Sequence, residues 1–184
     1  QFKGRIVLSS TSSIYNGNPL PYKEDMAVKV TDYYTECRYY IERLLELYSN
    51  LYNIKSIALR FFSVYGPKEE YKGKYANIVT QFLWNYLKKE KPIIYGDGTQ
   101  TRDFIFVDDI VEACVLASEI NSEFEILNLG TGIETSFNQV IEALNENFNT
   151  EVEPVYVKNP ITNYVKRTLA DTSKLIKVLG YKES

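Results

Sequence analysis

The stretch Asp32–Arg60, DYYTECRYYIERLLELYSNLYNIKSIALR, changes along its length from a helical to an extended pattern. Asp32 suits a helix N-cap, and four apolar side chains after it keep the spacing of one helix face, so we predict a helix from Asp32 to about Leu51. These four are Ile41, Leu44, Leu45 and Tyr48. Lys55–Arg60 (KSIALR) is a short apolar run typical of a buried strand, and Arg5–Ser9 (RIVLS) is another.

Strand and helix patterns continue to alternate beyond this stretch. Apolar runs predict strands at Pro92–Tyr95, Arg102–Val107, Glu125–Leu129 and Glu153–Val157. Further helices are predicted over Asn77–Lys89, from an N-cap at Asp108 to about Glu119, from a capping box of Ser136 and Gln139 to about Phe148, and from Asp171. Ser10–Thr31 reads as a long loop, and Gly96-Asp97-Gly98 as a turn. This alternation predicts an α/β fold with a mainly parallel sheet.

Composition narrows the possible chemistry. The chain has 184 residues, a net charge of −3, two cysteines and no histidine. Because Cys37 and Cys114 form no CxxC pair, we expect neither a Cys/His metal site nor a disulfide framework, which suits a reducing cytoplasm. The absence of histidine excludes Ser-His-Asp and Cys-His mechanisms, so a general base has to be Tyr, Lys, Asp or Glu. Without a basic run or a long apolar run, we expect neither nucleic acid nor a membrane as a partner.

One combination of side chains suits proton transfer. Tyr34 and Arg38 lie four residues apart on the predicted helix and therefore share a face. A cation at that distance would lower the pKa of the tyrosine from its ordinary value of about 10, and the hydroxyl of Thr11 could hydrogen-bond the phenol oxygen. Such a group can take a proton from an alcohol. On spacing alone, the plainer interpretation is favoured, with Tyr34 as an amphipathic core residue and Arg38 as a solvated helix charge.

Six motifs place these residues in a wider context. In chain order they are SSTSSIY (Ser9–Tyr15), YTECR (Tyr34–Arg38) with Glu42, RFFSVYGP (Arg60–Pro67), GDGTQTRDFIFVDD (Gly96–Asp109), NLGTG (Asn128–Gly132), and Ala170–Asp171 with LGY (Leu179–Tyr181). Together they resemble the NAD-dependent epimerase/dehydratase family of extended short-chain dehydrogenases/reductases, and within it the UDP-glucose 4-epimerases. The resemblance implies the C-terminal part of a Rossmann-type parallel sheet plus a smaller mixed α/β substrate-binding domain.

The resemblance also assigns roles to individual residues. It implies Thr11, Tyr34 and Arg38 as catalytic residues, with Arg38 standing where the family has lysine. NAD would be the cofactor, held by Ser9, Ser10, Tyr34, Arg38 and Phe61. A UDP-sugar would be the substrate, held by Thr11, Ser13, Ser63, Asn77, Tyr95 and Arg102. Three of the substrate contacts have a plainer alternative: Asn77 as a helix N-cap, Arg102 in an ion pair with Asp97 or Asp103, and Tyr95, together with Phe104, in core packing rather than stacked on uracil.

The resemblance further implies how the chain is divided. Residues 1–66 would form the C-terminal part of the NAD-binding domain, and residues 67–184 mainly the substrate-binding domain, with residues 103–130 returning to the Rossmann sheet. No G-x-G-x-x-G turn occurs in the sequence, so we expect this chain alone to be inactive and to hold NAD weakly. A homodimer is implied by the family. A piece of a normal enzyme, one half of a split enzyme, and a non-catalytic sugar-nucleotide-binding scaffold remain alternative interpretations.

Neighbouring residues discriminate among the family's reactions. Ser12-Ser13 follow Thr11 where the related dehydratases have Asp-Glu, and reducing epimerases use a Cys–His pair that needs a histidine. What remains is redox epimerisation or simple oxidation, and the resemblance to the UDP-glucose 4-epimerases implies 4-epimerisation of UDP-glucose and UDP-galactose through a 4-keto intermediate. An NAD-dependent sugar-nucleotide dehydrogenase or dehydratase is the second alternative.

Overall fold

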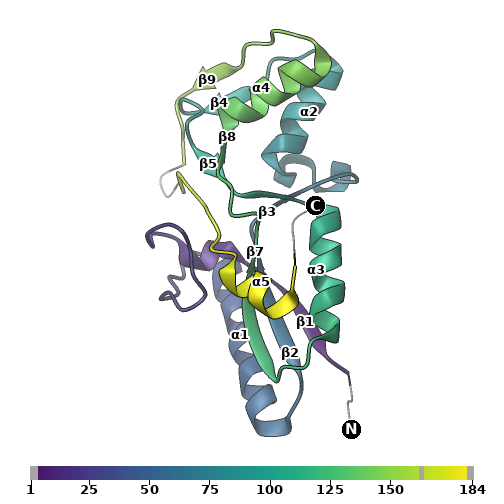
Figure 1. The fold of residues 1–184 in the computed structure, drawn as a ribbon. Coiled ribbons are helices and arrows are strands. Elements are labelled where there is room, and N and C mark those ends of the chain that lie inside the picture. The colour runs from purple at the N-terminus through teal and green to yellow at the C-terminus, as the bar shows by residue number, and fades with distance from the viewer. Residues whose placement is uncertain (1–3, 162–163, 182–184) are drawn as a thin grey trace.

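A three-stranded parallel sheet forms the centre of the computed structural model, which describes residues 4–161 and 164–181. Its strands are β1 (Ile6–Thr11), β2 (Ser56–Phe61) and β7 (Phe124–Leu129), in the order β1-β2-β7 (Figure 1). The register sets the last residues of the three strands, Thr11, Phe61 and Leu129, side by side. The parallel sheet and the α/β class predicted from the sequence are confirmed.

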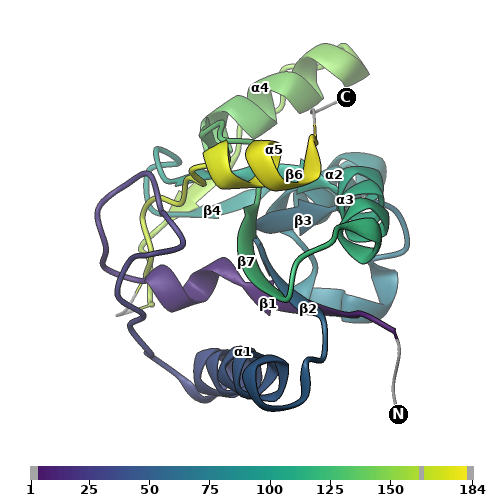
Figure 2. The ribbon, with the colours of Figure 1, turned by 60° about the horizontal axis from the view of Figure 1, so that its bottom comes forward.

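Helices cover both faces of this sheet. Helix α1 (Tyr33–Tyr52) lies on one face, and α3 (Val107–Glu119) and α5 (Ser173–Leu179) lie on the other (Figure 2). The face toward α3 and α5 is an apolar core, because alternate residues of the strands point to it. Its buried side chains include Ile57, Leu59, Leu127, Leu129, Ala113 and Leu175.

A second group of elements lies at one end of the molecule (Figure 1). Here α2 (Ile78–Lys88) packs against α4 (Phe137–Phe148) around a separate buried cluster that includes Phe82, Tyr86 and Ile141. Three short strand pairs accompany these helices. They are β4 (Ile93–Tyr95) with β9 (Val155–Val157), β5 (Thr101–Arg102) with β8 (Thr135–Ser136), and β3 (Ser63–Tyr65) with β6 (Phe104–Phe106).

Local capping explains where several helices begin. The Asp32 carboxylate accepts a hydrogen bond from the Thr35 amide at 2.8 Å, and the Ser136–Gln139 capping box forms as predicted. The predicted cap at Asp108 is wrong, since α3 begins one residue earlier and its N-cap residue makes no side-chain bond. Asp171 precedes α5 by two residues and accepts a hydrogen bond from the Ser173 amide at 3.0 Å.

Two predicted segments differ from the structure. The single strand predicted over Arg102–Val107 is split at Asp103 into β5 and β6, which belong to different strand pairs. The cause is the buried Asp103 side chain, which bonds backbone amides of two other segments instead of lying on a strand face. The predicted loop after Ser9 begins with the end of β1 and the 3-10 helix η1 (Ser12–Tyr15), and the 3-10 helix η2 (Glu70–Tyr75) was not predicted. Within the described residues, no helix is both long and apolar enough to cross a bilayer.

Candidate active site

Thr11 and Ser13 lie together where β1 ends. Thr11 is the N-cap of η1, and its hydroxyl oxygen accepts a hydrogen bond from the Ser13 amide at 3.2 Å. The same hydroxyl donates to Oγ of Ser13 at 3.2 Å. Phe61 is the strand neighbour of Thr11. Because ligands of open parallel sheets bind outside the carboxyl ends of the strands, this corner is the place where a ligand is expected.

Tyr34 and Arg38 reach the same corner from the first turns of α1. The Arg38 guanidinium donates from Nη1 to the carbonyl oxygen of Ser9 at 2.9 Å, and its Cζ lies 5.3 Å from the centre of the Tyr34 ring. The Tyr34 side chain is half exposed. Arg38 therefore ties the turn that carries Tyr34 to the end of β1, and places a positive charge against the aromatic face.

The expected bond between Thr11 and Tyr34 is not formed, since the Thr11 hydroxyl bonds Ser13. Among the described residues, the Tyr34 hydroxyl makes no hydrogen bond. Ser9, Tyr34, Arg38 and Thr11 are thus brought to one corner, with the Tyr34 side chain half exposed.

Ser10 has a different partner from the one that its motif implies. Its hydroxyl donates to Oε1 of Glu42 on α1 at 2.5 Å, inside the protein. Glu42 also accepts two bonds from Arg60 on β2, from Nε at 3.0 Å and from Nη2 at 2.7 Å. The two side chains are only 1% and 2% exposed. The hydroxyl of Ser10 thus belongs to a buried ionic cluster beneath the candidate site.

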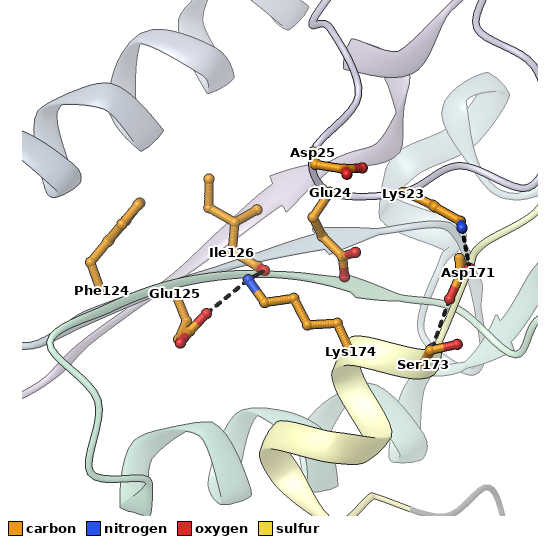
Figure 3. A pocket seen from close by; sticks show the side chains of 9 residues that line it. All are labelled: Lys23, Glu24, Asp25, Phe124, Glu125, Ile126, Asp171, Ser173 and Lys174. Atoms are coloured by element: carbon orange, nitrogen blue, oxygen red, sulfur yellow. Dashed lines mark hydrogen bonds and ion pairs between the residues drawn. The ribbon is translucent and has the colours of Figure 1, made fainter.

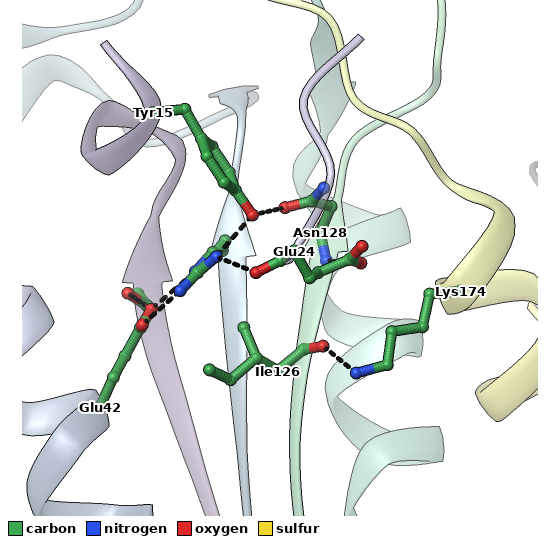
Figure 4. Close-up of polar contacts among 8 residues, drawn as sticks. Tyr15, Glu24, Glu42, Ile126, Asn128 and Lys174 are labelled. Atoms are coloured by element: carbon green, nitrogen blue, oxygen red, sulfur yellow. Dashed lines mark hydrogen bonds and ion pairs between the residues drawn. The ribbon is translucent and has the colours of Figure 1, made fainter. Parts of the chain in front are cut away.

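The cluster continues toward β7 (Figure 4). Arg60 donates from Nη1 to the Tyr15 hydroxyl at 2.6 Å, and Tyr15 donates to Oδ1 of Asn128 at 2.7 Å. Burial raises the pKa of Tyr15 to about 12, even though the Arg60 charge lowers it. Tyr15 therefore keeps its proton at neutral pH. Glu42 and Arg60 occur in the sequence as parts of two motifs, which do not predict their contact. The available signal was the charged residue inside the apolar run of β2.

Asn77 and Ser63, two residues expected to contact the substrate, lie beyond the sheet and are connected through Val64. The Asn77 side chain is the N-cap of α2: its Oδ1 accepts from the Val79 amide at 3.0 Å, and its Nδ2 donates to the Val64 carbonyl at 2.9 Å. Glu69 accepts a bond from the Asn77 backbone amide at 3.1 Å. The Ser63 amide donates to the Asp103 carbonyl at 2.9 Å. In this structure Asn77 is therefore the N-cap of α2, as the plainer alternative predicts.

Arg102 is held between two aromatic rings. Its Cζ lies 5.6 Å from the Phe137 ring centre and 5.3 Å from that of Tyr164, and its Nη1 donates to the Thr101 and Lys166 carbonyls at 2.7 and 3.3 Å. Burial lowers its pKa, but a guanidinium stays protonated in proteins. The side chain is fixed and charged, with only some of its five donors used by these two carbonyls.

The ion-pair alternative for Arg102 is not seen among the described residues. The Asp97 carboxylate bonds Thr99, and that of Asp103 bonds the 131–132 turn and the Ala170 amide.

Tyr95 and Phe104, expected as a pair beside uracil, line different cavities. Tyr95 is half exposed and borders a cavity of about 360 Å³ that it shares with Tyr164 and Lys166. Phe104 lines an apolar cavity of about 530 Å³ between α2 and α4 and packs against the buried cluster there. The two rings therefore do not form one stacking platform.

A larger cavity of about 600 Å³ runs along the outer edge of β7 (Figure 3). Lys174 enters it, pairs with Glu125 at 2.8 Å, and donates to the Ile126 carbonyl at 3.0 Å. Lys23 lies 3.8 Å from Asp171. Both lysines thus have acidic partners within the cavity.

Comparison with known proteins identifies a matching family model and several related proteins. Residues 1–130 match the model of the NAD dependent epimerase/dehydratase family. A putative UDP-glucose 4-epimerase of Methanocaldococcus jannaschii is 36% identical over 97% of this chain and 57% of its own length. A UDP-glucuronate 4-epimerase of Thermodesulfobacterium geofontis is 38% identical over 96% of this chain and 54% of its own length.

A similar solved structure is the UDP-N-acetylglucosamine 4-epimerase of Methanobrevibacter ruminantium in complex with UDP-N-acetylmuramic acid. It superposes with a TM-score of 0.93 at 29% identity, covering 98% of this chain and 58% of that one. This chain thus spans little more than half the length of the relatives it matches. With a family model that matches most of its residues and a fold shared along its whole length, the chain belongs to the NAD-dependent epimerase/dehydratase family.

Proposed function

We propose that the complete protein is an NAD-dependent sugar-nucleotide 4-epimerase, and that this chain provides its general base and its substrate-binding residues. The observation that carries the proposal is the corner where β1 and β2 end: the Tyr34 side chain is half exposed, and Arg38 connects its helix to Ser9. The two relatives and the solved structure named above differ in their sugar but are all named 4-epimerases. UDP-glucose and UDP-galactose are the proposed substrates.

NAD, when bound, supplies the acceptor and donor of hydride for C4 of the sugar. The residues at the corner suit the nicotinamide end of that cofactor. Arg38 offers further donors to the ribose, and Phe61 is a half-buried ring at the end of β2. Ser9 and Ser10 are proposed to support the cofactor site indirectly and not to contact NAD themselves. The Ser9 carbonyl accepts a hydrogen bond from Arg38, and the Ser10 hydroxyl bonds Glu42.

In this proposal Tyr34 takes the proton of the C4 hydroxyl and later returns it. The Arg38 guanidinium lies against the Tyr34 ring, and the Thr11 hydroxyl, once released from Ser13, can donate to the phenol oxygen. Arginine keeps the charge of the family's lysine but does not deprotonate, so it cannot pass the proton onward. Ser13 and Ser63 are proposed to contact the sugar.

Arg102 is the proposed partner of the substrate's pyrophosphate, because its fixed planar guanidinium can bond two phosphate oxygens. Asn77, at the start of α2, and Tyr95, at the mouth of the 360 Å³ cavity, are proposed to contact the UDP part. We also infer that residues 1–66 belong to the cofactor domain and residues 67–184 mainly to the substrate domain, with 103–130 returning to the sheet. The pairing of β7 with β2 and the separate cluster around α2 and α4 support this division.

Other interpretations make different predictions for the same experiment. A split enzyme needs a second chain for activity, and a scaffold binds sugar nucleotides without converting them. A dehydratase is disfavoured because Ser12 and Ser13, which follow Thr11, form the first turn of η1 and carry no acid. From the family resemblance, we also propose that the complete protein forms a homodimer.

The test measures conversion of UDP-glucose to UDP-galactose with added NAD⁺, using this chain joined to its natural upstream sequence. We expect conversion that is lost in Tyr34→Phe. Conversion of UDP-glucuronate or UDP-N-acetylglucosamine instead would change the substrate and keep the reaction. Absence of turnover on all three, with NAD bound, would refute the proposed function.

A further inference from the structure

The buried ion pair of Glu42 and Arg60 connects α1 to the sheet directly under the candidate site. Glu42 lies on α1 one turn after Arg38 and two turns after Tyr34, so it belongs to the same part of the helix. Its carboxylate accepts from Arg60 on β2 and from Ser10 on β1. One carboxylate therefore connects the catalytic helix to two strands.

Two consecutive residues of β1 are bonded to this helix. The Ser9 carbonyl accepts from Arg38, and the Ser10 hydroxyl donates to Glu42. The next residue is Thr11. These two bonds fix both the height of α1 along β1 and its rotation, because a slide of one residue would break them together. The distance from Thr11 to the Tyr34 turn depends on that register.

The energetics indicate that the ion pair serves to orient α1 rather than to stabilise the fold. Both groups are almost wholly removed from water, and the desolvation of two such charges cancels most or all of their attraction. Well-packed apolar side chains of similar size can replace such a pair with no loss of stability. Apolar contacts have no preferred direction, whereas the bidentate contact of Arg60 with Glu42 defines one orientation.

We propose that Glu42 and Arg60 are positioning residues for Tyr34 and Arg38, which they serve by fixing the register of α1 against β1 and β2. The proposal rests on the proposed function for its effect on turnover. A displacement of about 1 Å at a reacting group can cost about a hundredfold in rate. Loss of the pair should therefore reduce kcat more than it changes stability or substrate affinity.

The experiment replaces the pair by apolar side chains in the chain joined to its natural upstream sequence. In the double variant Glu42→Leu, Arg60→Met we expect a kcat reduced about 10- to 100-fold and a KM within about threefold. The Tm should fall by at most a few degrees, because the loss of the pair itself is close to neutral and the Ser10 hydroxyl loses its acceptor. The matched control is Lys174→Met, Glu125→Leu, which removes another ion pair, at the outer edge of β7, and should leave kcat unchanged.

A second variant serves if the double variant fails to fold. Arg60→Lys keeps the buried charge but removes the bidentate geometry, and should also lower kcat at constant KM. Hydrogen exchange in the first turns of α1 provides a readout that needs no activity: it should become faster in both variants, while exchange in α3 stays the same.

Each outcome decides one of the two proposals. A kcat within twofold of the parent, with unchanged exchange in α1, would overturn the positioning role. So would losses of Tm and kcat together with uniform exchange in all helices, since that pattern is a general structural defect. A parent enzyme that is inactive on every UDP-sugar refutes the proposed function, and the exchange measurement then still tests the positioning role.

Discussion

Replacing Asp103 by asparagine tests how the two halves of the structure are joined. Asp103 is fully buried and its carboxylate accepts four hydrogen bonds. Oδ1 accepts from the amide and hydroxyl of Thr131 at 2.7 and 2.9 Å, and Oδ2 from the amides of Gly132 and Ala170 at 3.0 and 2.9 Å. All four partners are donors, so the carboxylate suits them and an amide group does not. Burial raises the pKa of Asp103, and these four bonds lower it only in part.

The size of the effect follows from the number of donors left without an acceptor. With its NH₂ group at the Oδ2 position, the asparagine would face the amides of Gly132 and Ala170, and two bonds would be lost. At the Oδ1 position the NH₂ group faces the Thr131 amide and hydroxyl, and because the hydroxyl can turn to accept, only the amide is left without an acceptor. Each buried donor left unsatisfied costs about 1–3 kcal/mol, so Asp103→Asn in the better orientation should lower the free energy of unfolding by about 1–3 kcal/mol. The total stability of a typical domain is about 5–15 kcal/mol, so a loss of this size is readily measured.

The assay is denaturant unfolding followed by tyrosine and tryptophan fluorescence, with the midpoint and slope fitted for parent and variant. Asp97→Asn is the matched control, because Asp97 is exposed and its carboxylate bonds the amide and hydroxyl of Thr99, so water can replace these contacts and the midpoint should barely move. A loss below about 1 kcal/mol in Asp103→Asn would show that the neighbouring amides find other acceptors, and would refute the reasoning.

Three further predictions concern the candidate site. Tyr34→Phe should lower kcat of the complete enzyme by about 10²–10⁴ at unchanged Tm, because the ring is exposed and only a proton carrier is lost; full activity would remove Tyr34 as the base. Arg102→Lys should raise KM for UDP-glucose about tenfold and leave kcat within about threefold, since an ammonium cannot form the bidentate phosphate contact; an unchanged KM would exclude Arg102 as the phosphate ligand. Burial raises the pKa of Glu69, but its bonds with Lys72, Thr80 and the Asn77 amide outweigh burial and lower it overall. A lowered carboxyl pKa gives stability that is present above the unfolded pKa of about 4.3 and is lost as pH falls through the folded pKa. The Tm advantage of the parent over Glu69→Gln should therefore shrink below about pH 4 and stay constant above about pH 5. An advantage that is the same at pH 3 and pH 7 would contradict this.

The central sheet and most helix ends were predictable because they depend on local rules. The apolar runs in β1, β2 and β7 give strands, and the N-cap side chain of Asp32 and the capping box at Ser136 give helix starts that the structure confirms. These signals act within a few residues, so sequence alone reveals them.

The remaining features depend on partners far along the chain. Asp103 interrupts an apolar run because its acceptors meet amides near residues 131 and 170, and no local pattern announces such partners. The bond from Ser10 to Glu42 spans 32 residues, and the contact of Arg60 with Glu42 spans 18. The motifs assigned Ser10 to the cofactor for the same reason: they record residue order and not the direction of a side chain.

The outer edge of β7 has a consequence for assembly. In the parallel register, the odd-numbered residues of β7 bond β2, so the carbonyl of Ile126 and the amide of Asn128 point outward. The Lys174 ammonium takes the first and the Glu24 carboxylate takes the second at 2.8 Å. An intruding strand would have to displace both charges before it could pair, which is a common protection against edge-to-edge aggregation. The sheet is therefore closed to growth beside β7, and a strand that joins it has to pair with β1.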